Sequence, residues 1–129
     1  MEHKLADIFE KLNKEFKFVY NTTEAKKPLE ENWGEGDDAY AWVLPPHKEL
    51  EQYAKKAVEA SNKIHVIMLL PTNSDEDWWH KYCTQGTIFY IKGPVKYKKN
   101  RAAIPSAIVM LGKGIPKHTS LYVELREVD

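Results

Sequence analysis

The sequence predicts an α/β fold, with a small, mainly parallel sheet and helices on both of its faces. Residues 64–70 form an almost continuous apolar run, which is typical of a strand buried on both faces of a sheet. An apolar strand at 40–44 and a helical pattern at 47–61 precede this run. Strand, helix and strand in this order within about 30 residues indicate a βαβ unit.

One helix, one strand and a loop are expected before this unit. Residues 3–16 carry apolar side chains at helical spacing along one stripe. Residues 16–20 alternate and are rich in strand-forming residues. Residues 24–38 hold many charges, two glycines and few apolar residues, which indicates a loop. Trp33 lies in this polar stretch and is expected to cap a pocket or to join the core.

A short helix is expected at 74–83, with the acids at 75–77 in its first turn, where they complement the helix dipole. Trp78 and Tyr82 are four residues apart and are expected to pack into the core. Trp79 points in another direction and is expected to be exposed.

The C-terminal third is expected to be mostly strand. Runs rich in strand formers lie at 87–91 and 104–111, with a basic hairpin arm or loop at 95–101 between them. Residues 121–128 alternate between apolar and polar, which indicates a half-exposed edge strand. His65 opens an apolar strand and is expected to be a structural histidine rather than a ligand.

Composition indicates one soluble domain over residues 1–129, because 43% of the residues are apolar and 29% are charged. No stretch approaches the roughly 20 apolar residues of a membrane span. The N-terminus has no apolar region typical of a secretory signal. The single Cys83 excludes a disulfide within the chain and favours a reducing, intracellular location such as the cytoplasm.

The charges are unevenly distributed along a chain of zero net charge. Residues 1–77 have a net charge of −6, whereas residues 78–123 carry eight cations and no acid. Such a one-signed surface attracts phosphate, so DNA is the expected partner; a solvated, merely solubilising face is the alternative. The candidate DNA contacts are Lys92, Lys96, Lys98, Lys99 and Arg101.

The candidate site is Leu44-Pro45-Pro46-His47, where the strand at 40–44 ends. The carboxyl ends of strands in an α/β sheet open into a crevice, where ligands bind. The five histidines show no metal-ligand spacing, so no metal site is expected.

The chain resembles the small phage-type DNA N6-adenine methyltransferases in four blocks, which stand in that family's order across residues 40–112. The blocks are residues 42–47, residues 67–72 with 78–82, residues 88–93 and residues 104–110. The first block stands where the family has a catalytic Asn-Pro-Pro-aromatic or Asp-Pro-Pro-aromatic motif. The resemblance identifies the chain as a degenerate, shortened member.

The resemblance implies a reduced Rossmann-like fold that binds S-adenosylmethionine. It implies that the strands at 87–91 and 104–111 pair in antiparallel fashion at the end of the sheet. It also implies that the strand ending at Tyr20 is the remnant of the cofactor-binding strand, so Tyr20, Asn21 and Thr22 are the candidate cofactor contacts. No Gly-rich turn follows them.

The same resemblance places catalysis at Leu44, Pro45, Pro46 and His47. In the family, the Asn or Asp and the following Pro carbonyl accept hydrogen bonds from the adenine amino group, and an aromatic ring stacks on the flipped base. Here Leu44 has no acceptor, the Pro45 carbonyl can accept one bond, and His47 offers a flat ring.

Two function classes follow from these departures. The favoured class is a pseudoenzyme of phage or viral type that keeps the fold as a DNA-binding or interaction module in the cytoplasm of the host. The alternative is an active S-adenosylmethionine-dependent DNA adenine-N6 methyltransferase with an atypical Leu-Pro-Pro-His motif.

Overall fold

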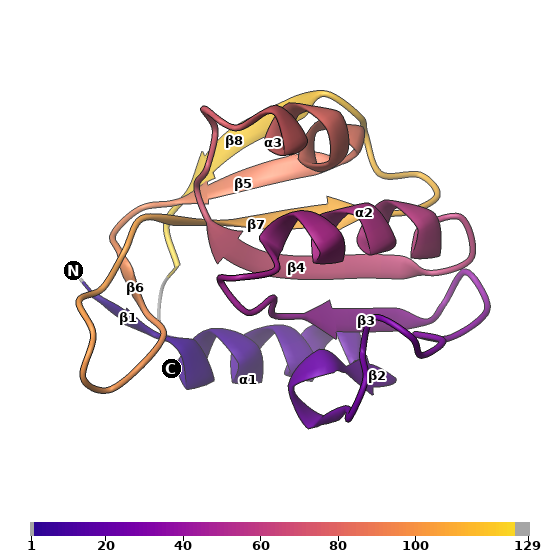
Figure 1. The fold of residues 1–129 in the computed structure, drawn as a ribbon, viewed down its shortest axis with the longest axis horizontal. Coiled ribbons are helices and arrows are strands. Elements are labelled where there is room, and N and C mark those ends of the chain that lie inside the picture. Colours follow the sequence, from indigo (N-terminus) through magenta and orange to yellow (C-terminus); the bar gives the residue numbers. More distant parts are fainter. Residues whose placement is uncertain (1, 126–129) are drawn as a thin grey trace.

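A six-stranded sheet in the order β2–β3–β4–β7–β5–β8 runs through the structure, a computed structural model that describes residues 2–125 (Figure 1). Its strands are β2 (Tyr20–Asn21), β3 (Tyr40–Val43), β4 (His65–Pro71), β5 (Thr87–Ile91), β7 (Ser106–Leu111) and β8 (Thr119–Val123). The helices are α1 (Leu5–Phe16), α2 (Leu50–Ala60) and α3 (Asp77–Tyr82). A second, two-stranded sheet pairs β1 (His3–Lys4) with β6 (Val95–Lys96).

The strand directions make the sheet mixed. Strands β2, β3 and β4 are parallel to one another, and β8 is parallel to β5. Strand β7 lies between β4 and β5 and is antiparallel to both. The α/β class and the antiparallel pairing of β5 with β7 are thereby confirmed, whereas the reduced Rossmann-like classification stays a prediction.

Helices cover both faces of the sheet, with α2 and α3 in front and α1 behind in Figure 1. The alternation along β4 explains why both faces are apolar. Ile67 and Leu69 pack with α1, whereas Val66, Met68 and Leu70 pack with α2. This arrangement confirms that the apolar run at 64–70 is a strand buried on both faces.

The strand expected at 16–20 is displaced toward the C-terminus. Phe16 is still helical, and Lys17 ends α1 in the left-handed conformation with φ of 53°. The Lys17 amide donates to the Asn13 carbonyl, and the Phe18 amide donates to Asn13 Oδ1 at 3.0 Å. These caps use the backbone groups that a longer strand would need, so β2 contains only Tyr20 and Asn21.

The polar loop at 24–38 contributes one residue, Trp33, to the core. Of the two roles expected for Trp33, core packing is therefore the one that the structure shows. Trp33 is 2% exposed, and its indole N–H donates to the Pro28 carbonyl at 2.9 Å. Its ring stacks on Tyr20 at 6.1 Å, and Lys56 Nζ lies 5.2 Å from the ring centre. The loop is therefore anchored to β2 and α2.

Two helices are shorter than predicted, and one tryptophan prediction is wrong. Turns closed by the Glu49 and Glu76 amides precede α2 and α3, which delays the start of both helices. Trp79 is 1% exposed and packs in the core, because α3 lies flat against the sheet. The edge strand β8 begins at Thr119, and the last part of the predicted strand, 126–128, lies outside the described residues.

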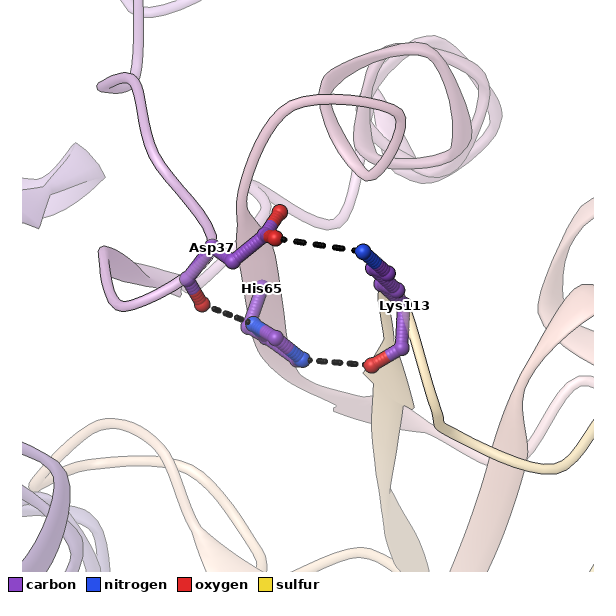
Figure 2. Close-up of polar contacts among 3 residues, drawn as sticks. All are labelled: Asp37, His65 and Lys113. Atoms are coloured by element: carbon purple, nitrogen blue, oxygen red, sulfur yellow. Dashed lines mark hydrogen bonds and ion pairs between the residues drawn. The ribbon is translucent and has the colours of Figure 1, made fainter.

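His65 joins two loops that are distant in sequence, as Figure 2 shows. Its Nδ1 faces the Asp37 carbonyl at 2.7 Å and its Nε2 faces the Lys113 carbonyl at 2.8 Å. Its ring stacks on Tyr40 at 4.7 Å, and the Asp37 and Lys113 side chains form an ion pair at 3.5 Å. The expectation of a structural histidine is confirmed. This contact lies at the amino edge of β4.

Candidate nucleic-acid interface

The Leu44–His47 segment leaves the sheet where β3 ends, at the left side of Figure 1. Strands β4 and β5 end at the same edge, because both share the direction of β3. The Pro46 carbonyl accepts the Glu49 amide at 2.9 Å, which closes a turn before α2. The predicted site therefore lies at the carboxyl edge of the sheet, as the position of the motif indicates.

Leu44 is held by the residue that directly follows β2. Its amide donates to Thr22 Oγ1 at 3.0 Å, and Thr22 is only 5% exposed. The Leu44 side chain packs against the apolar cluster on the α1 face. The structure thus brings a predicted cofactor residue next to the predicted catalytic motif, but position 44 contributes no hydrogen-bond acceptor through its side chain.

Pro45 and Pro46 differ in their surroundings. Pro45 is buried and Pro46 is exposed. Among residues 2–125 no donor is hydrogen-bonded to the Pro45 carbonyl, whereas the Pro46 carbonyl is already used in the turn. The turn before α2 therefore engages the Pro46 carbonyl and leaves the Pro45 carbonyl without a backbone donor.

The basic segment at 95–101 forms a hairpin arm beside the Pro-Pro motif. Of the hairpin arm and the loop expected for this segment, the hairpin arm is confirmed. Val95 and Ile104 exchange backbone hydrogen bonds at 2.8 and 2.9 Å. The Arg101 amide donates to the Lys98 carbonyl at 3.1 Å and turns the chain between them. The tip carries Lys98, Lys99 and Arg101, all exposed, and Lys96 lies on the ascending arm.

An aromatic contact joins the hairpin to the motif. The ring of His47 meets that of Tyr97 edge-on at 4.8 Å, with 78° between their planes. The Tyr97 hydroxyl donates to Ser106 Oγ at 2.7 Å, and Ser106 in turn donates to the Ile104 carbonyl at 3.0 Å. Tyr97 therefore fixes the hairpin between the start of β7 and the Pro-Pro segment.

The electrostatics of this contact favour a neutral imidazole. Partial burial, and then the nearby Lys98 ammonium, lower the pKa of His47 below its usual value. Burial raises the pKa of Tyr97 above the usual value of a phenol. At neutral pH the site thus presents an uncharged flat ring beside the Lys98 ammonium.

Lys92 lies before the hairpin rather than on it. Its amide donates to the Val123 carbonyl at 2.8 Å, and its own carbonyl accepts a bond from His3 Nε2 at 2.8 Å. The structure therefore brings Lys96, Lys98, Lys99 and Arg101 together on one arm and places Lys92 where that arm leaves β5.

The sequence analysis did not identify Tyr97 and Ser106 as site residues. An aromatic residue inside a basic run was a usable signal for Tyr97.

A family model described as DNA N-6-adenine-methyltransferase (Dam) matches residues 5–126. The match covers most of the 129 residues. The chain belongs to this DNA adenine methyltransferase family. No curated protein and no solved structure matches the chain. Membership in the Dam family implies DNA as the partner and suggests S-adenosylmethionine as a possible cofactor, while the phage-type subdivision stays a prediction.

The three predicted cofactor residues of this Dam family member already have partners within the chain. The Tyr20 hydroxyl donates to Glu31 at 2.7 Å. Asn21 Oδ1 accepts bonds from the Thr23 amide and hydroxyl at 2.9 and 2.7 Å. Thr22 Oγ1 accepts the Leu44 amide. Their polar groups thus stabilise the fold locally and do not converge on a ligand.

The surface beside these residues offers little room. A shallow hollow of about 240 Å³ lies between α1 and β2, and its walls include Phe9, Tyr20 and Asn21. This volume is below the roughly 300–1,000 Å³ of typical small-molecule pockets. Tyr20, Asn21 and Thr22 therefore do not fit the cofactor that Dam membership suggests, because the hollow beside them is too small to enclose it.

Within the described part of the chain, no three His, Cys, Asp or Glu side chains gather as a metal site. Between residues 2 and 125, every helix is too short or too polar to span a bilayer. Cys83 is buried, and burial raises the pKa of its thiol to about 12, which makes it a poor nucleophile.

Proposed function

We propose that this member of the Dam family is a non-catalytic DNA-binding module. The observation that carries the proposal is Leu44, which stands at the acceptor position of the Pro-Pro motif and is half-buried against the apolar cluster on the α1 face. The supporting observations are the internally bonded cofactor residues and the exposed basic hairpin attached to the same motif. A cytoplasmic protein, in a host cell if a virus encodes it, fits the lone reduced cysteine.

The chemistry of adenine explains why position 44 matters. The lone pair of the exocyclic amino group is delocalised into the ring, so transfer of a methyl group needs acceptors that polarise both N–H bonds. Leu44 leaves only the Pro45 carbonyl. Loss of one of two positioned hydrogen-bonding groups in an active site costs on the order of 10²–10³ in rate. A site without a fitting cofactor pocket loses far more.

DNA binding is supported by the chemistry of the hairpin. Lys98, Lys99 and Arg101 are exposed at its tip. The surrounding segment 78–123 contains no acid that would repel phosphate. Phosphate contacts of this kind supply most of the affinity in non-specific binding, and each contact adds to the salt dependence. The positive charge of the hairpin thus complements the negative charge of a duplex backbone.

A second candidate function is active adenine-N6 methylation. The free Pro45 carbonyl and the flat His47 ring favour it, since both would contact a flipped adenine. It requires cofactor binding by residues other than Tyr20, Asn21 and Thr22.

The salt dependence of DNA binding tests the proposal. The variant with Lys96, Lys98 and Lys99 changed to Ala should bind duplex DNA more weakly. Its plot of log affinity against log salt should be less steep by about 2–3 units, one for each lost phosphate contact. Fluorescence anisotropy with a labelled duplex between 20 and about 200 mM salt measures this slope.

A charge-matched variant controls for net charge. Lys14, Lys55 and Lys63 are exposed and lie outside the hairpin, so changing all three to Ala removes the same charge elsewhere. This control should keep most of the slope. Equal slopes for both variants would show that the hairpin is not the interface, and a wild type that binds no DNA at low salt would refute the proposed function.

A further inference from the structure

Strand β8 forms one edge of the six-stranded sheet, and its outer side is open. The sheet order ends at β8, and within residues 2–125 only β5 pairs with it (Figure 1). The Val123 carbonyl accepts the Lys92 amide at 2.8 Å, so the backbone groups of Val123 and of alternate residues before it face β5. The backbone groups of Ser120 and Tyr122 therefore face outward, where a further strand can pair with them.

This edge lacks the features that usually prevent an edge strand from pairing with another chain. Such features are charged side chains, prolines, bulges and a very short strand. The five residues of β8 are uncharged and include no proline, and each of them aligns with a residue of β5 without a bulge. The opposite edge strand, β2, has only two residues. Strand β8 is therefore the edge of this sheet that is better able to accept another strand.

The apolar side chains of β8 are exposed on both faces of the sheet. Leu121 is 41% exposed and Tyr122 is 85% exposed, and these are two of the three large apolar side chains that are exposed among residues 2–125. Because they are consecutive in a strand, they point to opposite faces. The Tyr122 ring contacts the Tyr90 ring of β5 at 5.5 Å between centroids, and its other side is open. A strand added beside β8 would cover part of both side chains.

The sequence of β8 is self-complementary in an antiparallel alignment. A two-fold axis through Leu121, the middle residue of the strand, aligns residues 119–123 with the same residues of a second copy. The outward backbone groups of Ser120 then lie opposite those of Tyr122 in the copy, which makes a hydrogen-bonded pair. Leu121 meets its own copy in the closer, non-hydrogen-bonded type of pair. A large ring thus lies beside a small side chain, and two apolar side chains come into contact.

The charges on either side of β8 favour the same arrangement. Lys117 lies in the stretch 112–118, which precedes β8 and contains no acid. Glu124 directly follows β8, and residues 124–129 contain three acids against one arginine. Antiparallel pairing of two copies brings the positive end of each strand to the negative end of the other, whereas parallel pairing would bring like charges together. The flanking charges therefore favour a second copy of the chain in the antiparallel direction.

We propose that β8 pairs with β8 of a second copy of this chain and joins the two sheets about a two-fold axis at Leu121. Such an interface uses the same surface on both copies, as in most soluble homodimers. Antiparallel pairing makes the carboxyl edges of the two sheets point in opposite directions, so the two Pro-Pro motifs lie on opposite sides of the joined sheet. The inference does not rest on the proposed function, because the dimer forms without DNA.

Sedimentation velocity over a series of protein concentrations, without DNA, tests the proposal. The wild type should show a reversible equilibrium between monomer and dimer. Leu121→Lys and Leu121→Glu each place two like charges opposite one another at the axis, so each should raise the dimer dissociation constant at least about 10-fold. An equimolar mixture of the two variants places opposite charges at the axis, and the dimer should return. A mere loss of apolar surface, or a misfolded variant, would not be rescued by mixing.

Leu121→Cys gives an independent measurement of the same contact. Residues opposite one another in a non-hydrogen-bonded antiparallel pair have Cα atoms about 4.5 Å apart, which is within the range of a disulfide. Mild oxidation should therefore link this variant into a covalent dimer on a non-reducing gel. Val19→Cys is the matched control, because Val19 is 64% exposed and lies beside β2 at the opposite edge of the sheet. The native Cys83 is buried and should not react.

Three results would overturn the inference. The first is a wild type that stays monomeric at millimolar concentration, which would leave β8 as an edge for a different partner. The second is a dimer whose dissociation constant is the same in the wild type, in both charged variants and in their mixture. The third is a Val19→Cys variant that forms the covalent dimer as readily as Leu121→Cys, which would show that the cross-link does not report pairing of β8.

Discussion

At the scale of single residues, the proposed site depends on Leu44 and His47. Leu44 stands where the resemblance predicts a polar acceptor, and its apolar side chain is half-buried against the cluster on the α1 face. His47 keeps a flat ring in contact with Tyr97 at 4.8 Å. The side chains that would polarise a base are thus reduced, while those that would stack on it or contact phosphate persist.

We predict a pH-dependent contribution of His47 to DNA binding. Its pKa is lowered by burial and by Lys98, so the ring is neutral at pH 7 and becomes charged only at more acidic pH. Wild-type affinity for duplex DNA should therefore rise, relative to His47→Phe, as the pH falls from 7 to 5. The salt slope should steepen by about one unit, as expected for one added cation. Parallel pH profiles for the two proteins would contradict this role.

The same shift affects stability in the opposite direction. Because folded His47 binds its proton less readily than unfolded His47, acid favours the unfolded chain as the pH falls below about 6.5. DNA titrations at pH 5 therefore need a thermal-unfolding control.

Leu44→Asn restores the missing acceptor and separates two defects. Because the cofactor residues Tyr20, Asn21 and Thr22 are bonded within the chain, the variant should still transfer no methyl group to duplex DNA. Labelled S-adenosylmethionine and an adenine-containing duplex measure this directly. Methylation by the variant alone would show that the acceptor is the only missing part and that a cofactor site is present.

At the scale of elements, patterns within one segment were predictable, and contacts between segments were not. The apolar run of β4 and the Pro-Pro boundary after β3 can be read from consecutive residues. The burial of Trp33 and Trp79 could not, because both lie among polar neighbours and are covered by elements distant in sequence. The contact between the His47 and Tyr97 rings is likewise a long-range contact. Both residues lie in segments that the sequence identifies as candidate sites, the Pro-Pro motif and the basic segment.

Boundaries were missed where a local hydrogen bond competes with the regular element. Lys17 in the left-handed conformation shortens β2, and turns closed by Glu49 and Glu76 shorten α2 and α3. Side-chain and turn hydrogen bonds of this kind are weak signals in sequence. These local hydrogen bonds nevertheless set where β2, α2 and α3 begin.

The contact of His65 with two loops should stabilise the fold without affecting the DNA site. His65→Phe keeps a ring against Tyr40 but removes the two ring nitrogens that face the Asp37 and Lys113 carbonyls, and with them the hydrogen bond that the ring N–H donates there. The expected loss is about 1–3 kcal/mol in the free energy of unfolding, measured by urea denaturation. Duplex affinity should not change, since the contact lies at the opposite edge of the sheet. A drop in affinity without a loss of stability would contradict this separation.

At the scale of the whole molecule, the sheet separates structural and binding contacts. The amino edge of β4 is closed by the contact between His65, Asp37 and Lys113 (Figure 2). The carboxyl edge carries the Pro-Pro motif and the basic hairpin. The acidic surplus lies in residues 1–77, and the acid-free segment 78–123 supplies the hairpin. A chain with no net charge thus carries a cationic arm at the carboxyl edge of the sheet.

Calorimetric titration of S-adenosylmethionine into the purified protein tests the central claim, which is that the Dam-family fold is kept here without its catalytic chemistry. We expect no heat of binding and no thermal stabilisation at millimolar ligand, because the polar groups of the cofactor residues are engaged within the chain. Micromolar affinity would contradict the account and would make adenine methylation by this Leu-Pro-Pro-His protein the leading function.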